Sequence, residues 1–230
     1  MNVEVGRRVF LGSAAAAGIG TVGGGLLVSS RLSAQTPGER DAIQNELVRQ
    51  LHESVLGMRG QRRGESARKL ASTLRLTAAH YETEGVDTAL RSYLQAAIRR
   101  DGRDALLQRE VDPQMLAAEA RGFGLATMPA LSPVDYAVRE RVLDSLLVRG
   151  ITPVLTNVAK TLDQISDALD AQPLPSLINA RQYEWCADVT NLLRILEITL
   201  AISCLWDPAM CVVITGMWVG LQLSLWAYGC

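Results

Sequence analysis

The chain has 230 residues, of which 48% are hydrophobic and 20% are charged. This composition is that of a globular protein, and the length is enough for one substantial core. Beyond residue 34 the sequence carries 20 basic and 23 acidic side chains. This slightly acidic balance argues against nucleic acid or an anionic membrane surface as a partner, because both require a basic face.

The first 34 residues are organised like an export signal. Arg7 and Arg8 form a charged start, residues 9–30 are apolar or small, and Ser33-Ala34 offers small residues for cleavage. Glycine recurs through the apolar stretch, and each glycine costs about 1 kcal/mol in a helix interior. We therefore expect residues 1–34 to be a signal peptide; an uncleaved anchor and a cut after Ser30 are the alternatives.

The arginine pair and the residues that follow it resemble the twin-arginine (Tat) class of export signals. The matching positions are Arg7, Arg8, Phe10 and Leu11, whereas Gly6 and Gly12 depart from the pattern. The resemblance implies recognition by the Tat translocase and delivery to the periplasm or the medium. It also implies that the domain folds before it crosses the membrane, in a reducing cytoplasm.

From residue 38 onward the apolar residues recur with a helical period, and no segment alternates as a strand should. Glycines at 57–64 and at Gly85 separate the first three predicted helices. Their apolar faces are Ile43, Leu47, Val48, Leu51 and Val55; then Ala67, Leu70, Ala71, Leu74, Ala78 and Tyr81; then Leu90, Tyr93, Leu94 and Ala97.

Three further helices are predicted by a capping oxygen before proline, at Asp112-Pro113, Ser132-Pro133 and Thr152-Pro153. Ser132 with Asp135 resembles a capping box, and Gly122 and Gly150 stand where helices should stop. The last of these helices carries a seam for a partner helix at Leu155, Val158, Leu162, Ile165 and Leu169. Residues 171–176, with two prolines, are the expected linker, so we expect about five helices before it.

All four cysteines lie in the last 45 residues of the chain. Two helices are predicted there, residues 186–206 and 209–230, joined by a turn at Asp207-Pro208. Cys204 and Cys211 flank the turn, Cys186 lies 18 residues before Cys204, and Cys230 lies 19 residues after Cys211. At about 1.5 Å per residue the two arms have nearly equal length. An antiparallel hairpin therefore predicts the disulfides Cys204–Cys211 and Cys186–Cys230, formed in an oxidising compartment.

Two other interpretations of the cysteines stay open. Four buried free thiols would behave as small hydrophobic side chains. A zinc site is disfavoured, because cysteine pairs in such sites usually lie two to four residues apart.

The final helix also raises the question of a membrane span. Residues 209–230 contain no charge and are long enough to cross a bilayer, and Trp206 and Trp226 are spaced like an interfacial belt. Against this, no basic residue follows Arg194, and Arg194 and Glu197 make a two-span hairpin costly. We favour a hairpin buried in a helical core.

Few residues in the sequence suggest chemistry. Among the two histidines, His80 has Glu84 one turn away, and a metal site between helices could combine them with His52 and Glu46. A solvated or singly bonded histidine is the commoner state.

Other polar and aromatic residues have structural explanations. Three aspartates are expected to cap helices: Asp112, Asp135 and Asp207. Four tryptophans are expected to pack the hairpin, with an aromatic ligand pocket as the alternative: Trp185, Trp206, Trp218 and Trp226.

The sequence thus predicts an all-α multi-helix bundle with a C-terminal antiparallel helical hairpin. Residues 35–172 form the helical domain and residues 173–230 the hairpin packed on it. No catalytic residue, cofactor or metal is assigned. The favoured function is that of an exported, non-enzymatic structural or interaction protein. The alternatives are a protein attached to the membrane through 209–230 or through an uncleaved signal, and a metal-dependent exported enzyme.

Overall fold

The structure, a computed structural model, describes residues 37–125, 134–170, 180–204 and 206–228. These ranges contain nine α-helices and no strand, which confirms the predicted all-α class. The signal residues 1–34, the linker 171–176 and Cys230 lie outside the described residues. The helices are α1 (Pro37–Gly57), α2 (Arg63–Thr83), α3 (Val86–Asp101), α4 (Arg103–Leu107), α5 (Pro113–Gly122), α6 (Tyr136–Arg149), α7 (Thr152–Asp170), α8 (Ala180–Ser203) and α9 (Pro208–Tyr228).

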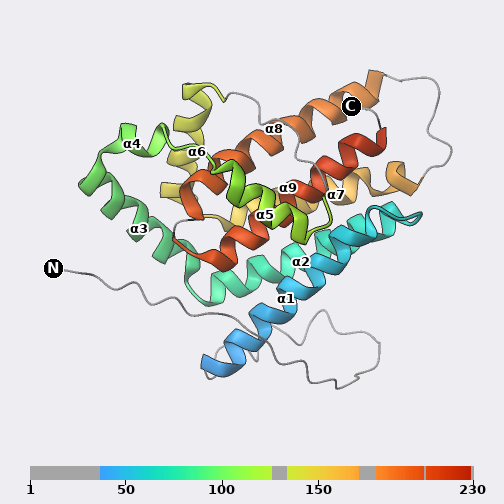
Figure 1. Cartoon of the computed structure of the whole chain (residues 1–230), viewed down its shortest axis with the longest axis horizontal. Coiled ribbons are helices and arrows are strands. Elements are labelled where there is room, and N and C mark those ends of the chain that lie inside the picture. The colour runs from blue at the N-terminus through green and yellow to red at the C-terminus, as the bar shows by residue number, and fades with distance from the viewer. Residues whose placement is uncertain (1–36, 126–133, 171–179, 205, 229–230) are drawn as a thin grey trace.

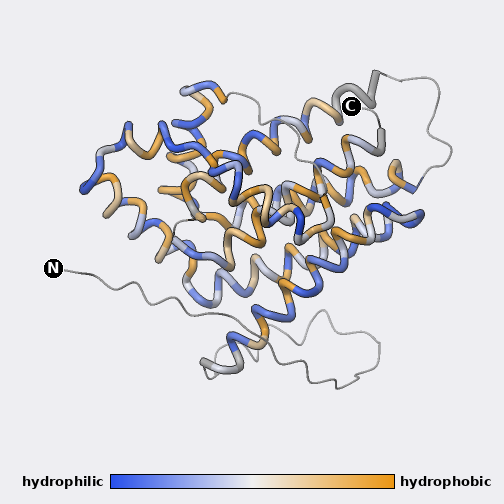
Figure 2. The backbone as a smooth tube through the Cα atoms, in the orientation of Figure 1, coloured by the Kyte–Doolittle hydropathy of each residue, from blue (hydrophilic) through white to orange (hydrophobic). Residues whose placement is uncertain are grey.

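The last helix, α9, runs through the middle of the bundle (Figure 1) and packs against α1, α5, α7 and α8. It is apolar on all sides, as expected of a helix that is surrounded by others. Hydrophobic positions gather where the central helices meet (Figure 2). The buried side chains of α9 include Met210, Ile214, Met217, Trp218 and Leu221.

The most extensive helix–helix interface in the described chain joins α2 and α7. All five side chains of the predicted seam on α7 are buried, so α2 is the partner helix that the seam requires. The pair is antiparallel, because Arg68 near the start of α2 binds Asp170 at the end of α7 (2.6 Å), whereas Arg75 binds Asp163. Gly64 permits the close approach: a Cβ there would overlap the Ser166 carbonyl oxygen.

The helix start predicted after Ser132 and the cap predicted at Thr152 are wrong. The helix expected after Ser132 begins at Tyr136, and Asp135 is its cap, accepting a hydrogen bond from the Ala137 amide (3.0 Å). At α7 the Thr152 hydroxyl does not cap; its Oγ1 is buried and has no hydrogen-bond partner within the described ranges. Asp87 of α3 accepts the Ile151 and Thr152 amides instead, at 2.7 and 3.2 Å. A cap supplied by another helix leaves no local signature in the sequence.

Seven helices, rather than about five, precede residue 171 in the described part of the chain. The short helix α4 covers five residues after Gly102, and a segment of that length is too short to show a helical period.

Candidate functional site

The hairpin of α8 and α9 is closed by a disulfide between Cys204 and Cys211, whose Cα atoms lie 4.6 Å apart. Glu197 lies seven residues before Cys204, and Trp218 lies seven residues after Cys211. The Trp218 indole nitrogen donates a hydrogen bond to Glu197 Oε1 at 3.2 Å. The disulfide and this hydrogen bond therefore share one antiparallel register.

The second predicted bridge joins residues farther along the same hairpin. No cysteine in the described part of the chain is free, and this includes Cys186. Cys230 lies outside the described residues, so the pairing Cys186–Cys230 stays a prediction.

Replacing Cys204 and Cys211 together by serine is expected to lower the free energy of unfolding by about 2–3 kcal/mol, because the bridge restricts a short loop in the unfolded chain. Urea denaturation of the oxidised wild type and of the double variant measures this difference. Full reduction of both proteins should bring their denaturation midpoints closer together. Identical midpoints before reduction would contradict a stabilising bridge.

Glu197 is a partly buried acid inside the hairpin. Its Oε2 has no hydrogen-bond partner in the part of the chain that the structure describes. Burial raises the pKa of Glu197, against the hydrogen bond from Trp218 and the positive charges of Arg194 and Arg139. The folded protein thus binds a proton at Glu197 more tightly than the unfolded chain does.

Glu197→Gln is expected to change how stability depends on pH. Because the folded protein raises the pKa of this carboxyl above its ordinary value of 4.5, the wild type loses stability as pH rises from 4.5 through the raised pKa. The glutamine variant should therefore gain in unfolding free energy relative to the wild type between pH 4 and pH 7, as measured by urea denaturation. The exposed Glu110, changed to glutamine, is the control and should show no such gain.

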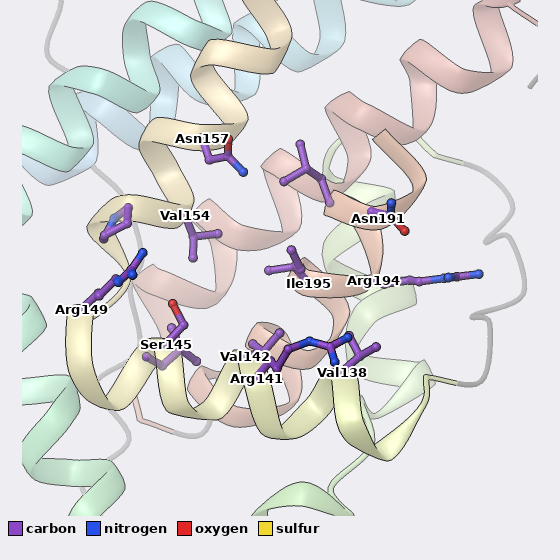
Figure 3. Close-up of a pocket in the computed structure, with 13 residues that line it drawn as sticks. Val138, Arg141, Val142, Ser145, Arg149, Val154, Asn157, Asn191, Arg194 and Ile195 are labelled. Carbon is purple, nitrogen blue, oxygen red and sulfur yellow. The ribbon is translucent and has the colours of Figure 1, made fainter. Parts of the chain in front are cut away.

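A groove lies between α6, α7 and α8 (Figure 3), with a volume of about 600 Å³. We call it the arginine groove. Three cations line it, Arg141, Arg149 and Arg194, together with the neutral polar side chains Ser145, Asn157 and Asn191. Its apolar lining consists of Val138, Val142, Leu146, Pro153, Val154, Leu192 and Ile195. Ligand pockets in proteins usually have volumes of about 300–1,000 Å³, with an apolar lining and a few polar groups.

The charge of the arginine groove has one sign. No acidic residue lines it, and within the described ranges Arg141, Arg149 and Arg194 make no ion pair or side-chain hydrogen bond. Many other arginines are paired, such as Arg103 with Asp144 of α6 at 2.6 Å, although the exposed Arg99 and Arg121 also make no ion pair within the described ranges. The guanidinium groups of the groove therefore remain available to an anion, and arginine binds carboxylate and phosphate through paired hydrogen bonds.

Of the residues considered for metal binding, His80 and Glu84 line one cavity, but His52 and Glu46 do not join them. His52 Nε2 bonds to the Gly122 carbonyl at 2.6 Å, and its ring stacks on Phe123. Hydrogen bonds from Arg49 lower the pKa of Glu46 to about 2. Across the described residues no group of three or more His, Cys, Asp or Glu side chains is placed to hold a metal ion. The metal-dependent alternative therefore gains no support.

The three aspartates expected to cap helices do so. Asp112 accepts from the Gln114 amide (2.9 Å), Asp135 from Ala137 (3.0 Å) and Asp207 from Ala209 (2.9 Å). The tryptophans differ in burial: Trp218 is 1% exposed, whereas Trp226 is 46% exposed. Trp206 lies beside Tyr93, with ring centroids 6.2 Å apart. Trp218 is therefore a packing residue of the hairpin, as expected, whereas Trp226 lies at the surface.

The question of a membrane span concerns α9 alone among the unbroken described helices. Residues Pro208–Trp226 are long and apolar enough to cross a bilayer, but 72% of the most apolar window is buried inside the fold. Most of this stretch of α9 is thus covered by protein.

Sequence reasoning missed the arginine groove. Its lining comes from three helices, and each arginine alone resembles an ordinary exposed residue on a helix.

Comparisons of the chain with protein-family models, with curated proteins and with solved structures find no match. The arguments on function therefore depend on the chemistry of this chain alone.

Proposed function

We propose that this chain is an exported, disulfide-bonded helical protein that acts by binding rather than by catalysis, and that the arginine groove is its binding site. The observation that carries the proposal is a set of three guanidinium groups, those of Arg141, Arg149 and Arg194, around an apolar groove and without a partner among the described residues. This combination suits an amphipathic anion, with a carboxylate or phosphate at the arginines and an apolar part in the groove.

The apolar part adds affinity through burial, at about 25 cal/mol for each Å² of apolar surface removed from water. The arginines add directional hydrogen bonds to the anionic group, and each charge-assisted hydrogen bond contributes about 1.5–3 kcal/mol. Ser145, Asn157 and Asn191 provide neutral hydrogen-bonding groups at the same groove, which would orient a bound headgroup.

The binding proposal is tested with a fluorescent long-chain fatty acid. Arg141→Ala combined with Arg149→Ala should weaken binding at least tenfold, since each arginine contributes about 1.5–3 kcal/mol. The matched control is Arg99→Ala with Arg121→Ala, which removes the same charge from exposed positions outside the groove. If both double variants lost the same amount of fatty-acid affinity, the binding would depend on overall charge and not on the groove, and the proposal would be overturned.

Export is supported by the arginine pair Arg7-Arg8 and by the Cys204–Cys211 bridge, since structural disulfides form and persist in oxidising compartments. Cell fractionation followed by non-reducing peptide mapping tests it. We expect cleaved protein outside the cytoplasm with no alkylatable thiol. Cytoplasmic protein with reduced cysteines would refute export, and protein that stays in the pellet after a carbonate wash would favour the membrane-attached alternative.

A further inference from the structure

A second, smaller cavity lies where α1, the end of α2 and the turn before α9 meet. Its volume is about 210 Å³, and we call it the polar cavity. Two of its lining side chains belong to the core: Tyr81 is 2% exposed and His80 is 4% exposed. Tyr81 Oη and His80 Nδ1 are both buried, and neither has a hydrogen-bond partner among the described residues. Buried polar groups in native proteins nearly always have a partner, so these two atoms indicate that the cavity holds a polar occupant.

The charges around the polar cavity favour a cation. Asp41, Glu84 and Asp207 line it, and Arg40 is the one arginine or lysine among its lining residues. Arg40 is already engaged, with its Nη1 3.1 Å from Glu84 Oε2. Asp207 uses Oδ1 to cap α9 through the Ala209 amide, so its second carboxylate oxygen can accept from a ligand.

The two buried side chains add acceptors to these carboxylates. Burial, and to a lesser extent the negative charge of Asp207, raise the pKa of Tyr81, so the phenol stays protonated. Burial, helped by the charge of Arg40, lowers the pKa of His80 against the charge of Glu84, which favours the neutral imidazole, and a neutral imidazole has one ring nitrogen that can accept. The cavity is therefore rich in acceptors, and its complement is a ligand rich in N–H donors.

A single metal ion does not fit this arrangement. The acids stand on different segments, at the start of α1, at the end of α2 and before α9, and no three His, Cys, Asp or Glu groups in the described chain are close enough to share an ion. A polyatomic cation can reach carboxylates that one ion cannot. We propose that the polar cavity binds a small organic cation that carries an ammonium or guanidinium group, between Asp41 and Asp207 on one side and Tyr81 and His80 on the other.

The probe for this site is agmatine, which carries one guanidinium and one ammonium group, with uncharged 1,4-butanediol and magnesium chloride as comparison ligands. Calorimetry and thermal denaturation on the purified folded chain should show saturable binding of agmatine and a raised melting temperature. Neither comparison ligand should do so. If agmatine causes no heat of binding and no shift at millimolar concentration, the cavity holds water only and the proposal is overturned.

Two variants distinguish specific binding in the polar cavity from nonspecific attraction of a cation to surface carboxylates. Asp207→Asn keeps the capping oxygen but removes the charge, and it should weaken agmatine binding at least tenfold. Asp188→Asn removes an exposed charge from α8, outside the cavity, and should leave the affinity unchanged. Equal weakening by both variants would overturn the proposal.

Tyr81→Phe tests whether the Tyr81 hydroxyl binds the ligand, because a purely structural hydroxyl would not affect the affinity for agmatine. The substitution removes a buried hydroxyl that no other described residue bonds, so the unliganded protein should keep or raise its melting temperature. If the hydroxyl contacts the cation, agmatine affinity should fall at least threefold in the same variant. An unchanged affinity would refute the role of Tyr81 in the site.

Discussion

Trp218→Ala is expected to lower the free energy of unfolding by about 3–5 kcal/mol, the usual cost of truncating a large buried aromatic side chain. Trp218 is 1% exposed at the centre of α9, and it donates the hydrogen bond that Glu197 receives. Its removal leaves both a cavity and a buried carboxyl without its donor. Urea denaturation monitored by far-UV circular dichroism measures the loss.

The same helix supplies the matched control. Trp226 is 46% exposed, so Trp226→Ala should cost less than about 1 kcal/mol, as surface substitutions usually do. If α9 instead spanned a membrane, Trp226 would anchor it at the interface and the detergent-free chain would not unfold cooperatively. Similar losses for Trp218→Ala and Trp226→Ala would contradict the buried arrangement of α9.

The fold class followed from the sequence because periodicity and capping are local signals. Hydrophobic residues spaced three and four positions apart predicted the apolar faces of α1, α2 and α7. A proline after the acidic Asp112 predicted the start of α5. The hairpin could be predicted for the same reason. Cys204 and Cys211 flank the turn at Asp207-Pro208 in the sequence, and the structure joins them in a disulfide. The equal arm lengths bear on Cys186–Cys230, which stays a prediction.

The parts that could not be predicted depend on contacts between distant segments. Asp87 lies 64 residues from the amide that it caps at Ile151, and nothing near Asp87 in the sequence marks it as a cap. Likewise, Gly64 donates its amide to Asp170 across the α2–α7 interface. Both candidate binding sites are of this kind, because each collects side chains from three or more segments.

The cap at Ile151 supports the second large prediction, that Gly150→Ala lowers the free energy of unfolding by about 3–4 kcal/mol. Gly150 has φ of 80°, in a region that costs a residue with a side chain about 1–3 kcal/mol. A Cβ there would also overlap the carboxyl group of Asp87. The substitution therefore displaces the acceptor for the first amides of α7, and loss of a cap costs about 0.5–2 kcal/mol.

Gly102→Ala separates these two costs. Gly102 has a similar backbone, with φ of 88°, but a Cβ at this position meets no atom within 4 Å. It should lose only the backbone cost of about 1–3 kcal/mol, and Gly150→Ala should exceed it by about the value of the cap. In the Asp87→Ala background the cap is already absent, so Gly150→Ala should then cost no more than Gly102→Ala. Full additivity of Asp87→Ala and Gly150→Ala in chemical denaturation would show that the two residues act independently, and it would contradict an α7 start held by Asp87.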